Sequence, residues 1–410
     1  MNIKNKLKIF NDPIYGFITI PNALIFDLIA HPYFQRLRRI TQMGLSYLVY
    51  PGAHHTRFQH ALGSLHLMQK AVQILKFKGV SISTAEETAL YAAILLHDIG
   101  HGPFSHAIEH SLIEEVGHEF ISLRFMELLN DEFNGQLSMA IIMFKGAYHR
   151  PFFGQLISGQ LDMDRSDYLK RDSFYTGVSE GNINSERLIS MMNVYDDQLV
   201  IEEKGIYSIE KFLSSRRLMY WQVYLHKTGV VAEQMTIKVL QRAKMLYQMG
   251  ISLEVSPSLD FFLKSIIKPS HLSEAILKKF SMLDDFDMVS ALKTWQNHSD
   301  FILSSLSKRL INRQLLKIKF GSKQEVKLAL KSTIKQCQSH LDMPDSAVPF
   351  FVFDGEVSNV GYSFKEQPIL ILNKNGKTSV LKKSSKLLNI KALSKEDKQF
   401  YICCPKELLS

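Results

Sequence analysis

The segment HDIGHGPFSH, residues 97–106, holds three histidines and one aspartate within ten residues. Adjacent residues of a regular helix point about 100° apart, so His97 and Asp98 converge on one ion only where a helix ends. Gly100 is expected to supply that end. Imidazole nitrogen and carboxylate oxygen form a mixed donor set for a divalent metal, compatible with Fe, Mn, Zn or Mg. A hydrogen-bonded pair at a helix end is the structural alternative, which the two further histidines disfavour.

Two donors do not complete a metal site, and the chain supplies others on both sides. Upstream, the segment HHTRFQHALG contains His60, and downstream the segment LDMDRSDY contains Asp164. Taken alone, one histidine is more often a satisfied core residue, and an aspartate-rich helix is more often a solvated face. Their combination with His97 and Asp98 predicts one metal site built from all four side chains.

The chain resembles the HD superfamily of metal-dependent phosphohydrolases. The H…HD…D ligand pattern of that superfamily is matched by His60, His97, Asp98 and Asp164. Within it, the chain is similar to the deoxynucleoside triphosphate (dNTP) triphosphohydrolases, over nearly its whole length and without a SAM domain. Further matching segments are NDPIYG at 11–16, FQRLRRITQMG at 34–44, PGAHHTRFQHALG at 51–63, LDMDRSDYLKRD at 161–172 and YLHK at 224–227. The resemblance implies a mainly α fold and hydrolysis of a dNTP to deoxynucleoside and triphosphate.

The resemblance also implies a catalytic group, namely His101, His106, Glu109 and His118. The departing 5′ oxygen of the sugar is an alkoxide and needs a proton, which a histidine with a pKa near working pH can supply. His106 is the expected general acid, with Glu109 one helical turn later to orient it. Glu109 stands where the family more often has aspartate. His101 is expected against the α-phosphate, and His118 completes the histidine group.

A substrate pocket follows from the same motif positions. The phosphates are expected to meet cationic and hydroxyl donors, namely Arg57, Arg165, Tyr168 and Arg216. Arg165 stands where relatives commonly have lysine. Gln42 and Asp172 match positions that bind the sugar 3′-hydroxyl, and Tyr224 matches one near sugar and base.

Regulation by a nucleotide effector in a homo-oligomer, a dimer or tetramer, is a further implication of the resemblance. Matching positions for such an effector are Lys8, Asn11, Gln35 and Arg38. Ala30 stands where the guanine-sensing relative has a carboxylate, so a guanine-specific activator is not expected.

The formal net charge of +9 and the pI near 9.2 favour polyanionic partners, such as nucleotides, nucleic acid or an acidic surface, although a solvated basic face explains the same numbers. Two alternatives to dNTP hydrolysis stay open: a phosphohydrolase acting on another nucleotide or on single-stranded nucleic acid, and a non-catalytic nucleic-acid-binding scaffold. The start of the chain lacks the features of a signal peptide, and the longest apolar run, residues 89–96, is too short to span a bilayer. A cytoplasmic protein without membrane contact is therefore expected.

These residues need a scaffold, and the patterns predict a mainly α one with short hairpins. Alternating apolar residues around Asn11–Gly16 predict an N-terminal hairpin. Helical periodicity covers residues 24–192, with a capping box at Thr84–Glu87, and resumes over 209–249 after a hairpin at 199–207. Strands are expected at 349–355, 368–373 and 377–383, the last two joined at Asn375-Gly376. The expected division is an HD core at 1–250, a helical segment at 251–339 and a small α+β lobe at 340–410.

Overall fold

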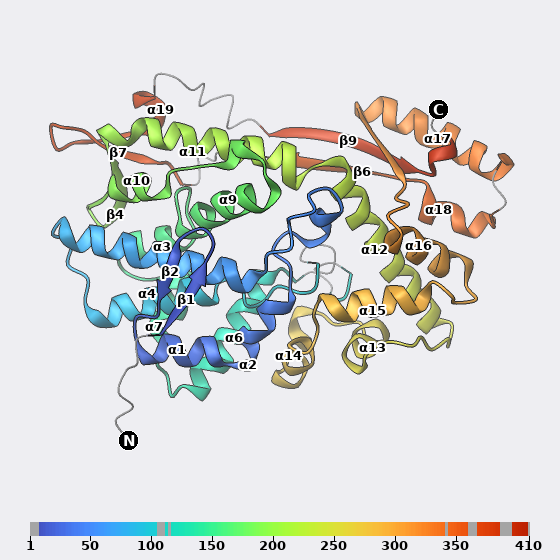
Figure 1. Ribbon diagram of the computed structural model, residues 1–410, viewed down its shortest axis with the longest axis horizontal. Coiled ribbons are helices and arrows are strands. Elements are labelled where there is room, and N and C mark those ends of the chain that lie inside the picture. The colour runs from blue at the N-terminus through green and yellow to red at the C-terminus, as the bar shows by residue number, and fades with distance from the viewer. Residues whose placement is uncertain are drawn as a thin grey trace.

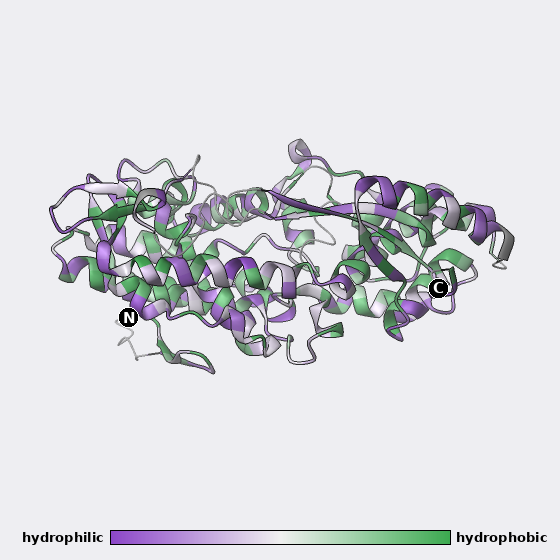
Figure 2. Cartoon of the chain, turned by 90° about the horizontal axis from the view of Figure 1, so that it is seen from above, coloured by the Kyte–Doolittle hydropathy of each residue, from purple (hydrophilic) through white to green (hydrophobic). Residues whose placement is uncertain are grey.

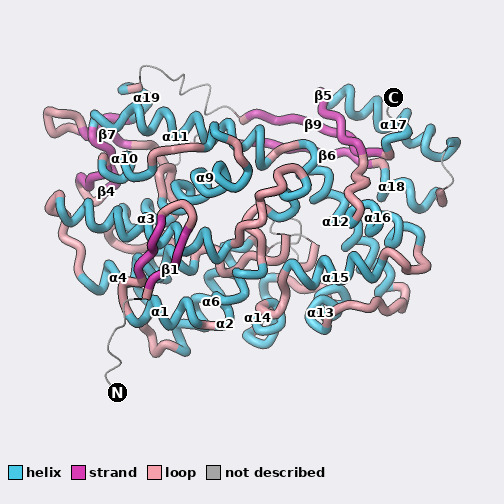
Figure 3. The backbone as a smooth tube through the Cα atoms, in the orientation of Figure 1, coloured by secondary structure: helices cyan, strands magenta, loops and turns pink. Residues whose placement is uncertain are grey.

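The computed structural model describes residues 8–104, 111–113, 116–340, 343–359, 367–385 and 396–408. The predicted mainly α class is confirmed: helices form most of the molecule, and the strands gather in small sheets near its two ends (Figures 1 and 3). His106 and Glu109, two of the expected catalytic residues, lie outside the described residues.

The N-terminal hairpin is confirmed as β1 (Ile9–Asp12) paired antiparallel with β2 (Gly16–Thr19). The Asp12 carboxylate accepts hydrogen bonds from the amides of Ile14 and Tyr15, which stabilises the turn. Gly16 has φ +74°, a left-handed conformation that favours glycine. The hairpin lies over the helices that carry the metal-site motifs (Figure 1).

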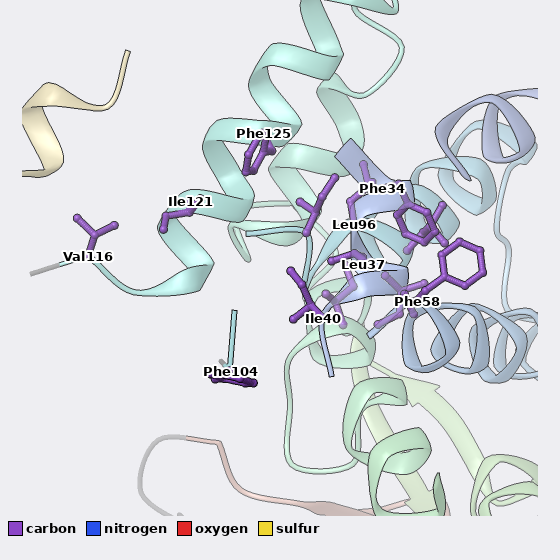
Figure 4. Close-up of a cluster of buried hydrophobic side chains, with 14 of the residues drawn as sticks. Phe34, Leu37, Ile40, Phe58, Leu96, Phe104, Val116, Ile121 and Phe125 are labelled. Atoms are coloured by element: carbon purple, nitrogen blue, oxygen red, sulfur yellow. The ribbon is translucent and has the colours of Figure 1, made fainter. Parts of the chain in front are cut away.

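The helices of the first 200 residues surround a continuous apolar core. Phe34, Leu37 and Ile40 follow one another around a short helical segment and lie beside Phe58 and Leu96 (Figure 4). The helices of this part are α1 (Ala23–Ala30), α2 (Pro32–Gln35), α3 (Arg57–Phe77), α4 (Thr84–Leu96), α6 (His118–Glu132), α7 (Ser138–Phe144), α8 (Phe152–Ile157), α9 (Met163–Thr176) and α10 (Ser185–Ser190).

Helix α4 is the expected core helix, since every residue from Ala89 to Leu96 is buried. Its predicted cap was wrong by one position: Ser83 and Glu86 form the capping box. Glu87 instead accepts a hydrogen bond from Tyr91, one turn later. The helix also ends earlier than expected, because His97 is its C-cap.

The middle hairpin lies earlier than expected. Strands β3 (Met192–Tyr195) and β4 (Gln198–Glu202) pair antiparallel around Asp196-Asp197, both of which have positive φ. Aspartate tolerates that conformation better than most residues, so Asp-Asp can occupy the two central positions of a hairpin turn in which Asn-Gly is more common. Residues after β4 continue into α11 (Ile206–Met219), a wider helical turn at Tyr220–Tyr224, and α12 (Lys227–Gln248).

The second half contains a further set of helices and the C-terminal strands. Strands β5, β9 and β6 form an antiparallel sheet in that order, and β7 and β8 form the expected hairpin around Gly376. The elements are α13 (Pro257–Lys264), α14 (Glu274–Phe280), α15 (Asp285–Trp295), α16 (Phe301–Ile311), β5 (Lys317–Gly321), α17 (Lys323–His340), α18 (Val348–Phe351), β6 (Phe353–Asn359), β7 (Leu370–Leu372), β8 (Thr378–Val380), α19 (Leu381–Ser384) and β9 (Asp397–Cys404).

Strands that are distant in sequence pair with each other in one sheet. β4 pairs in parallel with β7, so the expected core segment and the expected C-terminal lobe contribute to one sheet. The three-part division by residue number therefore stays a prediction. The polar and apolar residues are mixed along the elongated molecule (Figure 2). In the part of the chain that the structure describes, no helix combines the length and apolarity needed to cross a bilayer.

Candidate active site

The four expected metal ligands meet beneath one cavity. The Nε2 atoms of His60 and His97 lie 3.3 Å apart, and they lie 3.1 and 3.4 Å from Oδ1 of Asp164. Asp98 places one carboxylate oxygen 3.4 Å from Nε2 of His97 and the other 3.7 Å from Nε2 of His60. Three stretches of chain, α3, the end of α4 and the start of α9, thus bring their donors to one point.

The other nitrogen of each imidazole is held by an acceptor. His60 Nδ1 lies 2.8 Å from Oδ2 of Asp167, and His97 Nδ1 lies 2.7 Å from the carbonyl oxygen of Ile94. Such contacts place the proton on Nδ1 and turn the lone pair of Nε2 toward the common centre. Two facing lone pairs repel each other unless a cation lies between them. The donors and their orientation therefore fit a divalent metal ion, on which the HD domain depends.

The electrostatics of the centre agree with that assignment. Burial alone raises the pKa of Asp98, but the positive charges of His97 and Arg57 lower it well below its ordinary range. Burial disfavours a protonated His60, yet its hydrogen bonds with Asp164 and Asp167 raise its pKa to about 10. The anionic side chains therefore attract positive charge strongly, and a divalent cation competes with that proton.

A second group of donors adjoins the first, since Asp98, His101 and His118 also approach one another. The rings of His101 and His118 are stacked, with centroids 3.8 Å apart and planes 17° apart. A nitrogen lone pair lies in its ring plane, so stacked rings do not direct their lone pairs at one ion. Burial, followed by the charge of Arg57, lowers the pKa of His101 well below its ordinary value. His101 is consequently a neutral hydrogen-bonding group rather than a cation.

The loop after α4 is held by residues that the sequence reasoning did not single out. Arg36 is fully buried and donates hydrogen bonds to the carbonyls of Ile99 at 3.0 Å and His101 at 2.9 Å. Gly100 packs so closely on α6 that a Cβ there would lie 2.3 Å from the amide nitrogen of Ser122. Close packing is thus the reason for this glycine, not helix termination.

An acidic residue at the start of α15 fixes the far end of the same loop. Asp285 accepts hydrogen bonds from the amide of Phe104 at 2.9 Å and from the amide and hydroxyl of Thr41 at 2.9 and 2.7 Å. The helical segment that follows the HD core therefore helps to position the HD motif.

A chain of buried ion pairs links the N-terminal hairpin to the metal centre. Arg171 of α9 contacts Asp12 of β1 at 2.8 Å and Asp167 at 2.8 Å. Asp167 in turn holds the His60 imidazole. All of these side chains except that of Asp12 are fully buried, and Asp12 is nearly so. Asp12, Asp167 and Arg171 thus orient a metal ligand, a role that sequence position alone did not reveal.

The cavity above the centre has a volume of about 510 Å³, a size typical of small-molecule sites. Asp98, Asp164, His101 and His118 line its floor, together with Arg57, whose guanidinium contacts the Asp98 carboxylate. Arg57 is one of five expected substrate-binding residues in this cavity, and the other four are Gln42, Tyr168, Asp172 and Tyr224.

Two of these residues, Tyr224 and Asp172, are hydrogen-bonded to each other in the cavity wall. The Tyr224 hydroxyl donates to Asp172 at 2.8 Å, and His55 contacts the other oxygen of that carboxylate at 2.7 Å. The side-chain oxygen of Gln42 is buried, with no hydrogen-bond partner within the described ranges. An acceptor of this kind, at a cavity wall, is suited to a ligand hydroxyl.

Two expected phosphate-binding arginines lie outside the cavity lining. Arg165 pairs with Asp162, one turn away on α9, at 2.7 Å. Arg216 is buried behind Tyr220 and reaches Gln160 at 3.5 Å. Their role toward phosphate stays a prediction.

The four expected effector residues lie at the molecular surface near the N-terminal hairpin. Lys8 rests over the ring of Phe26, and Arg38 rests 3.6 Å from the centre of the Phe58 ring. Gln35 accepts a hydrogen bond from Arg38 at 2.9 Å, and Asn11 is exposed on β1. Their effector role stays a prediction.

The cavity also has a wall that was missed. Helix α12 contributes Glu233 and Gln234, and the C-terminal sheet contributes Glu356, Val357 and Tyr401. Glu233 and Gln234 lie about two turns after the recognised YLHK segment, so helical spacing offered a faint indication. The strand residues are more than 180 positions from the HD motif in sequence, and nothing local to them indicates a site.

Comparison with protein families gives two adjoining matches. The HD domain matches residues 57–171, and the HD associated region matches residues 183–252. The uncharacterized protein YwfO of Bacillus subtilis is 34% identical over 421 residues, which cover 98% of this chain and 93% of that protein. The deoxynucleoside triphosphate triphosphohydrolase SAMHD1 homolog of Dictyostelium discoideum is 32% identical over 60% of this chain. That match covers 51% of the Dictyostelium protein, about half its length.

Two solved structures are similar to this chain over 98% of its length. The crystal structure of a phosphohydrolase from Bacteroides thetaiotaomicron matches with a TM-score of 0.92 and 50% identity, covering 98% of this chain and 100% of that one. A hypothetical protein from Aquifex aeolicus matches with a TM-score of 0.72 and 27% identity, over 98% of this chain and 97% of its own.

Proposed function

This chain belongs to the HD family of metal-dependent phosphohydrolases, and from that premise we propose that it hydrolyses deoxynucleoside triphosphates to deoxynucleoside and inorganic triphosphate. The observation that carries the proposal is the composition of one cavity. Asp98 and Asp164 of the metal centre line it together with Gln42, Asp172 and Tyr224, which suit a sugar hydroxyl. The dNTP triphosphohydrolase named above among the relatives supports the same substrate class.

The reaction breaks the bond between the α-phosphorus and the 5′ oxygen, and water supplies the new oxygen on the triphosphate. When bound, a divalent metal supplies Lewis acidity toward the attacked phosphate and the attacking water. His101 stays the predicted partner of the α-phosphate, and the Arg57 guanidinium, which contacts Asp98, adds positive charge to the same cavity. The sugar alkoxide leaves with a proton, for which His106 stays the predicted donor.

Two tyrosines keep the hydroxyl form that this role requires. Burial, followed by the charges of Tyr220 and Asp172 respectively, raises the pKa values of Tyr168 and Tyr224 well above their ordinary value. Both therefore remain hydrogen-bond donors at pH 7. Asp172 and the Tyr224 hydroxyl, whose proton is donated to Asp172, offer acceptor oxygens to the 3′-hydroxyl, and the 2′ position of a ribonucleotide is left to be excluded sterically.

The wall that sequence reasoning missed is the proposed base-binding end. Glu233 offers a carboxylate and Gln234 an amide, so this end favours a base edge that carries N–H donors. A guanine edge offers such donors at two adjacent positions, and a thymine edge at only one.

Product analysis tests the proposal. Purified protein is incubated with each dNTP, singly and as mixtures, with Mn²⁺ or Mg²⁺, and the products are separated by chromatography. Deoxynucleoside and triphosphate are expected, with turnover lost in Asp98→Ala and retained in Asp260→Ala, a change on the surface of α13. Monophosphate with pyrophosphate, or cleavage of only another phosphoester, would contradict the proposed substrate and leave the phosphohydrolase class intact.

A further inference from the structure

Nearly all of the net positive charge of this protein lies in one segment. The whole chain has a formal net charge of +9, whereas residues 301–340 contain nine lysines or arginines and one glutamate, a net charge of +8. The segment forms three consecutive elements, α16, β5 and α17, at the C-terminal end of the molecule (Figure 1). The remaining 370 residues are close to neutral. Charge concentrated in this way creates a local positive potential that attracts polyanions.

Helix α17 arranges part of this charge in a regular stripe. Four residues of an α-helix advance about 6 Å along the axis and about 40° around it. Lysines recur at that interval on one exposed side, as Lys323, Lys327, Lys331 and Lys335. The adjoining side of the helix packs onto the protein through Val326, Thr333 and Cys337, which are buried. α17 lies at the outer edge of the molecule, and much of it is hydrophilic (Figure 2).

The stripe is not neutralised by its own helix. Glu325 is the one acidic residue of α17, and its carboxylate accepts the amide of Ser322 at 2.7 Å in the first turn. Over the described parts of the chain, Lys327 and Lys331 form no ion pair. Their charges therefore face solvent.

A cationic hollow adjoins the stripe. It has a volume of about 600 Å³ and is lined by Lys308 and Arg309 of α16, by Lys406 and by the ring of Phe301, with Glu407 as its acidic residue. Phe301 is 41% exposed, although it is a large apolar side chain. The Lys406–Leu408 segment, which supplies Lys406 and Glu407 to the hollow, contacts α17, so the hollow lies next to that helix.

We propose that α17 and this hollow bind single-stranded nucleic acid, with the lysine stripe against backbone phosphates and Phe301 stacked on a base. One strand of a duplex carries a phosphate for about every 3.4 Å of helix axis, and a single strand is more extended, so lysines about 6 Å apart along α17 can each meet a different phosphate. Lysine is a flexible point charge, which binds phosphate without reading sequence. A cationic path beside an exposed aromatic ring is the composition of surfaces that bind single strands.

The same observations disfavour an acidic protein as the partner. Recognition of carboxylates uses the planar fork of arginine, and protein interfaces bury an apolar centre. The stripe contains lysines alone, and its exposed apolar neighbour is the single side chain of Leu328. The binding is therefore expected to be independent of base sequence and strongly salt-dependent.

Fluorescence anisotropy with a labelled oligothymidylate of about twenty nucleotides tests the proposal on the full-length protein. At low salt, Lys327→Glu/Lys331→Glu should weaken binding at least about tenfold, because two phosphate contacts become repulsions. The matched control is Lys278→Glu/Lys279→Glu on α14, which changes the charge equally on another exposed helix and should alter affinity less than twofold. In Lys327→Gln/Lys331→Gln, the slope of log affinity against log salt should fall by about 1.4, that is about 0.7 per lost contact.

Several results would overturn the proposal. They are no binding at low salt, an equal loss in the α14 control, duplex bound as tightly as the single strand, or polyglutamate competing as well as nucleic acid at equal charge. The last result would assign the surface to an acidic protein. Unchanged dNTP turnover in the α17 variants excludes misfolding as the cause of lost binding. The affinity for nucleic acid is measured separately from turnover, so this test does not depend on the proposed dNTP substrate.

Discussion

The metal centre and the lysine stripe of α17 differ in how their charged side chains are surrounded. In the centre, His60, His97 and Asp98 are buried and Asp164 is partly buried, and partners fix the direction of the imidazoles, as Asp167 does for His60. Along α17, lysines are exposed and evenly spaced, and the single acidic side chain of the helix is engaged elsewhere. Buried charges need fixed partners because low dielectric makes an unpaired charge costly. Exposed charges such as those of Lys327 and Lys331 need no fixed partner, because water solvates them, and they can move to meet a polyanion whose shape is not fixed in advance.

Removing a metal ligand should have the largest effect. We expect Asp164→Ala to lower turnover by about 10³-fold or more, because Lewis acidity contributes several kcal/mol to the barrier. Metal content, measured by inductively coupled plasma mass spectrometry after gel filtration, should fall well below one ion per chain. Glu233→Gln removes an acidic group from the same cavity but outside the donor set, and it should retain the metal. An Asp164→Ala variant with full metal content would show that the ion is held elsewhere.

Breaking the buried ion chain should be the next largest effect, and it measures the cost of an unpaired buried charge. Arg171→Met leaves Asp12 and Asp167 without their common cation, and we expect the free energy of unfolding to fall by about 3–5 kcal/mol. Urea unfolding followed by circular dichroism measures this change.

Two further variants serve as comparisons for Arg171→Met. Arg124→Ala breaks an exposed pair with Glu127, and it should cost at most about 1 kcal/mol. Arg171→Lys retains the charge but loses the fork, so its loss should be intermediate. Equal losses in the buried and exposed variants would contradict the contrast drawn between the two kinds of charge.

A smaller effect is expected at the proposed base-binding wall. Glu233→Gln exchanges an acceptor for a group that also donates, which should change the ranking of the four dNTPs by roughly threefold to tenfold in kcat/KM, about 1 kcal/mol. Rates are compared for all four substrates at equal metal concentration. Uniform loss for every dNTP would assign Glu233 to general packing instead of base selection.

The smallest effect is expected where the basic segment joins the rest of the protein. Asp300 caps α16 at Leu303 and pairs with Arg242 of α12. Burial raises the pKa of Asp300, but the hydrogen bond from Arg242 outweighs burial and holds it below its ordinary value of 3.8. The folded state therefore binds this proton more weakly than the unfolded state does.

The sign of the pH dependence follows. The contribution of Asp300 is present above pH 3.8 and is lost as pH falls through the lower folded pKa. Asp300→Asn should lower the free energy of unfolding by about 1 kcal/mol near pH 7, with a smaller difference in acid. Thermal unfolding of both proteins from pH 7 down to the acid limit of folding measures it. A difference that grows in acid would contradict this assignment.

Sequence reasoning predicted the elements whose causes are local. The N-terminal hairpin, the buried helix α4 and the β7–β8 hairpin follow from alternation, all-round apolarity and an Asn-Gly turn. Its errors were also local. Ser83 rather than Thr84 caps α4, since two adjacent hydroxyl residues compete for that role. The β3–β4 turn uses Asp-Asp in place of a glycine turn.

The sequence by itself predicted the four side chains of the candidate metal centre, because histidines and aspartates from three separate segments together match one known ligand pattern. It also determined the lysine stripe, because a four-residue interval needs only a helix to place all four charges on one side. Only the tertiary structure decided that Asp12 and Arg171 support His60, that Arg36 and Asp285 hold the HD loop, and that α12 and the C-terminal sheet close the cavity. These contacts join residues distant in sequence, and their geometry is set by packing, for which no local pattern exists.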